Sequence, residues 1–301
     1  MRIIVCALCF VLGALTAAAD WRVAKEVAPS LAEETRAKFE AQLAEAKAAY
    51  AKEASADNLI WVGRRTAYLG RYKEAIFIFS RGIVAYPKDA RIYRHRGHRL
   101  LTLRCFAEAA SDFEKGLELT AGKPDEIEPD GLPNARNIPT STLQFNLWYH
   151  LGLARYLQGD FEGAVAAYRR CMNVSKNPDT VVATTHWLYM ALQRAGRTGE
   201  AGMVLGAVPD DIEVIEDHDY LKLLHLYLGK IAPEDMETAL GKDATGGLSD
   251  ASLGYGLANW HLYNGRAEEA EKLFRRIVAG DQWSSFGYIA AEAELARLAS
   301  E

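Results

Sequence analysis

Small and aromatic apolar positions recur early in the chain at a fixed interval of 34 residues. Gly63 and Gly97 stand one interval apart, and so do Ala75 and Ala109. The other pairs at this spacing are Tyr72 with Phe106, Phe79 with Phe113, and Gly82 with Gly116. A period of this length predicts an array of helical hairpins, in which each unit buries its apolar face against the next.

The residues that carry the period also suit the parts of a helical hairpin. Gly63 and Ala75 are small enough for two helices to cross closely, Gly70 suits the turn between them, and Pro87 ends the second helix. This pattern resembles the tetratricopeptide repeat (TPR) family. The whole chain also resembles a type of exported bacterial TPR protein that has no defined activity.

The pattern continues toward the C-terminus with lower fidelity. A third unit spans residues 145–178, a fourth spans 182–208 with Tyr189 where a glycine is usual, and a last one spans 251–279. We therefore expect an all-α, right-handed α-solenoid of about five to six TPR-like hairpins, with an N-terminal helix and a C-terminal capping helix at Trp283–Leu298. The expected organisation is a signal peptide at 1–19, an N-terminal helical segment at 20–55, repeats 1 and 2 at 56–120, an irregular insertion at 121–142, and repeats 3–6 with the cap at 143–301.

The first residues have the layout of a secretory signal peptide. Arg2 precedes an apolar run from Ile3 to Leu15, and three alanines end at Ala19. Thirteen apolar positions give a helix of about 20 Å, short of a hydrocarbon core of about 30 Å. We expect cleavage near Ala19, a periplasmic or secreted mature chain, and no membrane span.

Two cysteines follow the signal segment. The repeat alignment places Cys105 in a turn between helices and Cys171 near the far end of a different helix, so a disulfide between them is out of reach. We expect two free, mostly buried thiols.

The interval between corresponding glycines lengthens to 55 residues from Gly97 to Gly152, so 21 extra residues separate repeats 2 and 3. This insertion, residues 121–142, holds four prolines and four acidic residues, a composition that resists regular structure. Its apolar residues and its Asp-Gly and Asn turn signals indicate an ordered path instead of a free linker. The insertion residues of interest are Asp125, Glu126, Glu128, Asp130 and Asn134.

In TPR proteins the ligand generally lies in a concave groove lined by the first helix of each repeat. Carrying the family's positions onto this chain gives a basic and aromatic groove on a protein whose formal net charge is −5. Arginine and tyrosine are common anchors of interfaces. The partner-binding residues expected from this resemblance are Arg64, Arg91, Arg94, His98, Tyr149, Tyr156, His186 and Arg194.

Two hypotheses compete for the basic cluster in repeats 1 and 2. In the first, its arginines bind an acidic peptide, a C-terminal carboxylate or a small anion. In the second, the acidic insertion folds back and occupies the arginines itself. The acidic overall charge argues against nucleic acid as a ligand in either case.

Catalytic and metal-binding signals are weak. His95 and His98 are three residues apart and share a helical face, but no carboxylate or cysteine has a matching spacing nearby. No nucleophile motif or phosphate-binding glycine loop is present in the sequence. We expect no enzyme activity, no cofactor and no metal. The sequence favours a non-catalytic scaffold or adaptor in the bacterial cell envelope that binds a protein segment or acidic peptide; the alternative is a small-ligand or metal-assisted binding module closed by the insertion.

Overall fold

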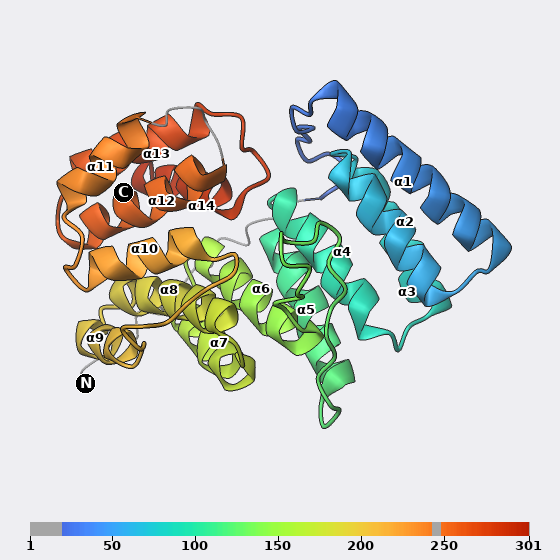
Figure 1. The fold of residues 1–301 in the computed structure, drawn as a ribbon, viewed down its shortest axis with the longest axis horizontal. Coiled ribbons are helices and arrows are strands. Elements are labelled where there is room, and N and C mark those ends of the chain that lie inside the picture. Colours follow the sequence, from blue (N-terminus) through green and yellow to red (C-terminus); the bar gives the residue numbers. More distant parts are fainter. Residues whose placement is uncertain (1–19, 243–247, 301) are drawn as a thin grey trace, which may run out of the picture.

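The computed structural model describes residues 20–242 and 248–300, and within these residues all the regular structure is α-helical (Figure 1). An isolated β-bridge between Ile127 and Thr142 closes the insertion at its base. The all-α prediction is confirmed. The helices are α1 (Glu33–Lys52), α2 (Ala56–Tyr68), α3 (Tyr72–Ala85), α4 (Ala90–Thr102), α5 (Phe106–Thr120), α6 (Leu143–Leu157), α7 (Phe161–Val174), α8 (Pro178–Arg194), α9 (Thr198–Gly206), α10 (His218–Tyr227), α11 (Pro233–Lys242), α12 (Leu248–Tyr263), α13 (Ala267–Val278) and α14 (Phe286–Leu298).

Helices α2 to α9 form four consecutive hairpins, each packed against the next, and α1 packs on the first. The close crossing in a hairpin depends on a glycine in its first helix. A Cβ atom at Gly63 would lie 2.4 Å from the Phe79 ring, which is far inside van der Waals contact. The same contact recurs in the next two hairpins, between Gly97 and Phe113 and between Gly152 and Tyr168. This contact is the physical basis of the sequence period.

The turn of the second hairpin departs from the pattern. Gly70 has a φ of 77° in the first turn, and the equivalent position in the second is Arg104, with a φ of 63°. A side chain in this left-handed region is unfavourable. The Arg104 guanidinium lies 3.9 Å from the centre of the Trp283 ring and forms an ion pair with Glu292 at 2.5 Å. These contacts with the C-terminal region hold the turn in place.

The C-terminal helices fold back over the inner side of the array (Figure 1). Helices α10 and α12 contact α8, and α14 contacts α6. The loop before α14 reaches the first hairpin, where the Trp283 and Tyr72 ring centroids are 6.1 Å apart.

The expected C-terminal helix forms. Helix α14 packs on the last hairpin, α12 and α13, through a face on which Ile289, Ala290 and Ala291 are fully buried, and it also contacts α6.

Cys105 and Cys171 are free and buried, as the repeat register predicts. In the described part of the chain, no helix is long and apolar enough to cross a membrane. The signal peptide expected at 1–19 lies outside the described residues.

Candidate functional site

The insertion lies directly on the inner surface of the first hairpin. Nη1 of Arg64 donates to the carbonyl of Pro129 at 2.8 Å, and Nη1 of Arg65 donates to the carbonyl of Gly131 at 2.9 Å. A Cβ at Gly131 would lie 1.7 Å from the Tyr68 hydroxyl oxygen, so only glycine fits this close approach. Helix α2 therefore holds the backbone of the insertion at two successive points.

Glu128 is the side chain that the insertion places in the groove. Its Oε2 lies 2.8 Å from Nε of Arg94, and the two side chains are only 10% and 11% exposed. The same oxygen accepts a hydrogen bond from Nδ2 of Asn146 at 3.0 Å. Charge pairing and the hydrogen bond together offset the cost of burying this carboxylate.

Two histidines surround the other side of Arg94. Its Nη1 lies 3.2 Å from Nδ1 of His95 and 3.3 Å from Nδ1 of His98. Burial lowers the pKa of both rings well below the usual value, and neighbouring arginines lower it further. The rings are neutral at pH 7, and because a guanidinium only donates, each Nδ1 accepts and each Nε2 carries the proton.

This arrangement does not support a metal site at His95 and His98. Their Nδ1 atoms face a cation, which repels a metal ion. Across residues 20–242 and 248–300, no group of three or more His, Cys, Asp or Glu side chains is placed to hold a metal.

Arg91 has other partners than the insertion. It pairs with Asp57 and Asp89, each at 2.6 Å, and the hydrogen bond to Asp89 is the main factor that raises its pKa. Two carboxylates already neutralise this guanidinium at the edge of the groove. The hypothesis that the insertion occupies Arg91 is therefore wrong, although its contacts with Arg64 and Arg94 are present.

The remaining polar residues of the insertion shape the loop itself. Asp125 accepts hydrogen bonds from the Thr142 hydroxyl at 2.6 Å and from the Gln144 backbone at 2.9 Å, at the start of α6. The Glu126 carbonyl accepts from the Leu143 backbone at 2.8 Å. The Asp125 side chain and the Glu126 backbone thus anchor the base of the loop. Among the described residues, neither carboxylate forms an ion pair with an arginine of the cluster, which corrects the expectation for them.

Asp130 and Asn134 lie further along the insertion. Nδ2 of Asn134 donates to Glu216 at 2.5 Å, before α10, so the loop also contacts the C-terminal part. Among the described residues, Oδ2 of Asp130 is buried without a hydrogen-bond partner. Burial raises the pKa of Asp130, and the charge of Glu216 raises it further.

Tyr149 and His186, expected in the groove of repeats 3 and 4, are covered by α10. The Tyr149 hydroxyl lies 3.5 Å from that of Tyr220, and the His186 ring stacks on Tyr220 with centroids 4.5 Å apart. Burial lowers the pKa of His186 to about 3, so the ring is neutral at pH 7.

Tyr156 and Arg194 are covered by α12 and α14. The Tyr255 hydroxyl donates to that of Tyr156 at 2.9 Å, and Arg194 pairs with Glu294 at 2.5 Å. Of the four residues expected in this half of the groove, Tyr149, Tyr156 and His186 are thus buried and Arg194 is half-buried. Around repeats 1 and 2 the inner surface is covered by the insertion instead.

Sequence reasoning missed Arg65 and Arg99, which also approach the inner surface around repeats 1 and 2. Arg99 lines a cavity there with Arg64 and Arg94. It follows Arg94 by five residues and falls outside the groove positions of the repeat, so only its positive charge was available as a signal.

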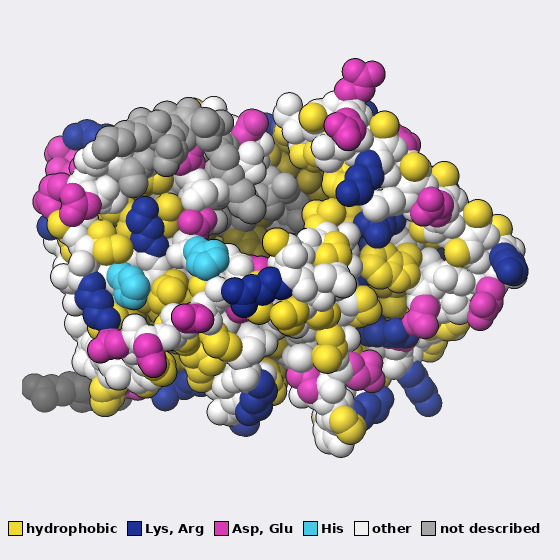
Figure 2. Space-filling view, in the orientation of Figure 1, with side chains coloured by type: hydrophobic (Ala, Val, Ile, Leu, Met, Phe, Trp, Pro, Cys, Tyr) yellow, Lys and Arg dark blue, Asp and Glu magenta, His cyan; other side chains and the backbone are white. Residues whose placement is uncertain are grey.

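On the face shown in Figure 2, Lys and Arg side chains are interspersed with Asp and Glu side chains.

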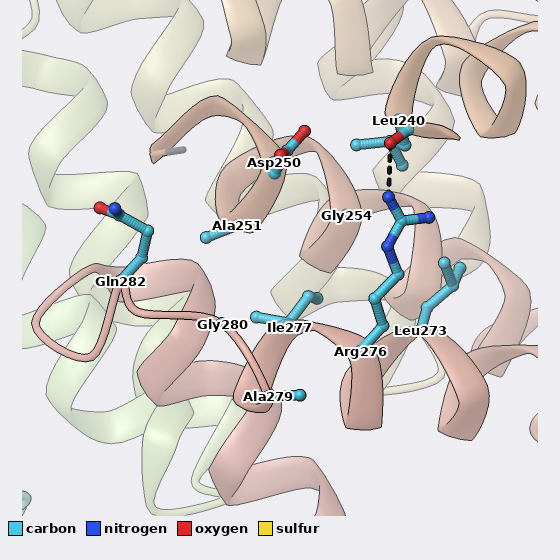
Figure 3. Close-up of a pocket in the computed structure, with 10 residues that line it drawn as sticks. All are labelled: Leu240, Asp250, Ala251, Gly254, Leu273, Arg276, Ile277, Ala279, Gly280 and Gln282. Atoms are coloured by element: carbon cyan, nitrogen blue, oxygen red, sulfur yellow. Dashed lines mark hydrogen bonds between the residues drawn. The ribbon is translucent and has the colours of Figure 1, made fainter. Parts of the chain in front are cut away.

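A second cavity, of about 220 Å³, lies between α11, α12 and α13 (Figure 3). Its walls are mostly apolar, and the Arg276 guanidinium donates to the carbonyl of Leu240. Asp250 and Gln282 do not point toward Arg276. Because its polar groups do not converge, this cavity is a weaker candidate for a site.

The comparison with family models agrees with the repeat architecture. The tetratricopeptide repeat family model matches residues 145–178. No curated protein matches the chain. Similar solved structures include YrrB, described as a TPR protein with an unusual peptide-binding site (15% identity, 83% of this chain and 97% of that chain, TM-score 0.43). Another is PilW, a type IV pilus biogenesis factor (16% identity, 82% of this chain and 88% of that chain, TM-score 0.47). A third is MamA (16% identity, 58% of this chain and 82% of that chain, TM-score 0.44).

The matched segment coincides with the hairpin of α6 and α7, which has the same glycine–aromatic contact as the two hairpins before it. The hairpin at residues 145–178 is thus a tetratricopeptide repeat, and the two hairpins before it share its packing.

Proposed function

We propose that this protein is a non-catalytic interaction scaffold of the bacterial cell envelope, and that repeats 1 and 2 bind an acidic, extended segment of a partner protein. The observation that carries the proposal is the pairing of Glu128 with Arg94 inside the groove. The chain's own insertion there has the chemistry of such a ligand. The envelope location rests on the layout of residues 1–19.

The contacts of the insertion combine two kinds of recognition. Arg64 and Arg65 bind backbone carbonyls, which every peptide has, and Arg94 binds a carboxylate, which only an acidic peptide has. Backbone contacts give affinity and a side-chain pocket gives specificity in the binding of extended peptides. A partner segment with a glutamate at the position of Glu128 fits this surface.

The insertion is also a competitor for any such partner. A tethered segment has an effective concentration in the millimolar range for a short flexible connection, so a weak external peptide does not displace it. We expect partner binding to require release of residues 127–133 from the groove. The insertion therefore sets a threshold of affinity that excludes weak ligands.

A peptide supplied in trans tests the proposal. The probe is a labelled peptide with the sequence of residues 124–132, and its control carries Gln in place of Glu128. The receptor is the full mature chain with residues 127–133 replaced by Gly and Ser of equal number, which keeps Asp125 and Asn134. We expect binding by fluorescence anisotropy to this variant, weaker binding to the natural chain, and at least a tenfold loss with the Gln peptide, because a hydrogen bond to a charged group contributes about 1.5–3 kcal/mol. Equal affinity of the two peptides would refute carboxylate recognition.

A small-ligand module is the second candidate. It is supported by a cavity of about 250 Å³ beneath the insertion, lined by Trp61, Arg64, His95 and Glu128 among others. A ligand in that cavity would tighten the insertion instead of displacing it. Slower hydrogen exchange of residues 121–142 on ligand addition would favour this candidate, and faster exchange would favour the scaffold.

A further inference from the structure

A separate cavity lies between α2 and α4, next to the position of Glu128. Its volume is about 120 Å³. The polar residues that line it are Arg64, Tyr68, Arg94, His95, His98 and Arg99, and the apolar ones are Ala67 and Phe79. No carboxylate is among the lining residues. We refer to it as the arginine cavity.

Arg99 contributes a positive charge to the cavity that no carboxylate of residues 20–242 or 248–300 neutralises. Within the described residues it forms no hydrogen bond or ion pair, and its nearest aromatic contact is the Tyr72 ring at 5.8 Å. Burial lowers the pKa of Arg99 to about 10, so the guanidinium is still charged at pH 7. Arg99 is half-buried, and a guanidinium at the wall of a cavity without a protein partner is available to an anion that enters the cavity.

The charges around the cavity do not balance. Three guanidinium groups line it, and Glu128 neutralises one of them from the neighbouring side, through Arg94. Asp130 is within electrostatic range of Arg64 but does not line the cavity. The walls therefore have an excess of about two positive charges.

The uncharged polar groups of the cavity also suit an anion. Nδ1 of His95 and of His98 faces Arg94 as an acceptor, so both rings carry the proton on Nε2. Nε2 of His95 lies 3.8 Å from Oε1 of Glu128, so the Nε2–H of His98 is the histidine donor without a carboxylate beside it. The Tyr68 hydroxyl also donates when an acceptor is present. The cavity thus combines hydrogen-bond donors with positive charge, the pattern of a site for oxyanions.

We propose that the arginine cavity is a binding site for a small divalent inorganic oxyanion, phosphate or sulfate. Two negative charges match the excess of positive charge, and four oxygens can accept from converging donors. The volume of the cavity also suits such an anion, because an engineered cavity of about 150 Å³ holds benzene, a ligand of similar size. The insertion stays in place in this complex, so the site does not depend on the proposed peptide binding.

Thermal unfolding of the full mature chain tests the proposal. The probe is about 10 mM inorganic phosphate, with sulfate as a second divalent oxyanion, acetate as a monovalent one, and chloride at equal ionic strength as the reference. We expect phosphate and sulfate to raise the Tm by about 2–4 °C over chloride. Acetate is expected to have little effect, and an acetate effect equal to that of phosphate would overturn the divalent site.

Variants locate the site. Arg99→Gln removes the charge without a partner, so we expect an unchanged or higher Tm in chloride and the loss of the phosphate effect. Arg81→Gln is the matched control, because Arg81 is an exposed arginine on α3, and it is expected to keep the whole phosphate effect. Tyr68→Phe keeps the ring and removes one donor, and we expect about a fivefold weaker phosphate affinity by calorimetric titration.

Two results would overturn the inference: no specific phosphate effect in the natural chain, or a full effect in Arg99→Gln. Either result leaves peptide binding by the variant with Gly and Ser at 127–133 untouched. Conversely, failure of that peptide experiment leaves the phosphate effect in the natural chain intact. The two proposals therefore fail separately.

Discussion

Replacement of Glu128 by alanine tests whether one buried ion pair holds the insertion in the groove. The substitution removes the partner of Arg94 at 2.8 Å and the acceptor of the Asn146 hydrogen bond at 3.0 Å. The substitution leaves the hydrogen bonds of Arg64 to the Pro129 carbonyl and of Arg65 to the Gly131 carbonyl, and these become the main contacts between the insertion and α2. We expect the insertion to open more often, while the helical array stays folded.

The magnitude follows from the burial of the pair. Both side chains are about one-tenth exposed, and removal of one partner from a buried ion pair costs about 3–5 kcal/mol. The lower limit, about 3 kcal/mol, applies because Arg94 keeps its contacts with His95 and His98. This corresponds to roughly a 100-fold higher population of the open insertion.

Hydrogen exchange with mass spectrometry measures this population. We expect about 100-fold less protection for amides in residues 124–142 of Glu128→Ala, and little change in α2 and α4. Glu118→Ala is the control, because Glu118 pairs with Lys115 at the exposed surface, where a pair contributes at most about 1 kcal/mol. Equal protection of the insertion in Glu128→Ala and in the natural chain would refute the reasoning.

Three further predictions concern the array and its closure. Gly63→Ala would put a Cβ 2.4 Å from the Phe79 ring, so we expect a loss of about 1–3 kcal/mol in urea unfolding; a loss below about 0.5 kcal/mol would contradict the close crossing. Burial acts to raise the pKa of Glu294, but its partners Arg194 and Arg297 outweigh burial and hold that pKa below 4.5. The natural chain should therefore lose stability as pH falls below about 4.5, and Glu294→Gln should lose less. Equal slopes of Tm against pH in the two chains would count against this ion-pair cluster. Burial raises the pKa of the Cys105 and Cys171 thiols to about 12. A thiol reagent at pH 7 should therefore label both cysteines in denaturant and neither in the folded chain. Labelling of the folded chain would show that these sites open.

The hairpins were predictable because their main contacts are local. Gly63 and Phe79 belong to one hairpin and meet across a single turn, so the repeat interval records this contact directly. The composition of the insertion also indicated an ordered loop that could approach the arginines. It did not indicate which carboxylate enters the groove, because that depends on the folded path of the loop: Asp125 accepts a hydrogen bond from the Gln144 backbone, and Glu128 faces Arg94.

Contacts between distant parts of the chain were not predictable in this way. Arg104 adopts a positive φ because its guanidinium binds Trp283 and Glu292, almost two hundred residues later. The repeat alignment contains no information about such a partner. Arg99 was missed for a related reason, since its role depends on a cavity formed jointly by two helices of different repeats.

The sequence by itself determined the helical hairpins, their order, the free state of the two cysteines and the inward side of each first helix, because spacing along the chain specifies all of these. Only the tertiary structure decided which inward surfaces are open. Helices α10, α12 and α14 return over α6 and α8 and cover Tyr149, Tyr156, His186 and Arg194, whereas around α2 and α4 the insertion covers the surface through Glu128. The physical reason is that a repeat period describes contacts between neighbouring units, and the closure of a curved array depends on contacts between its ends.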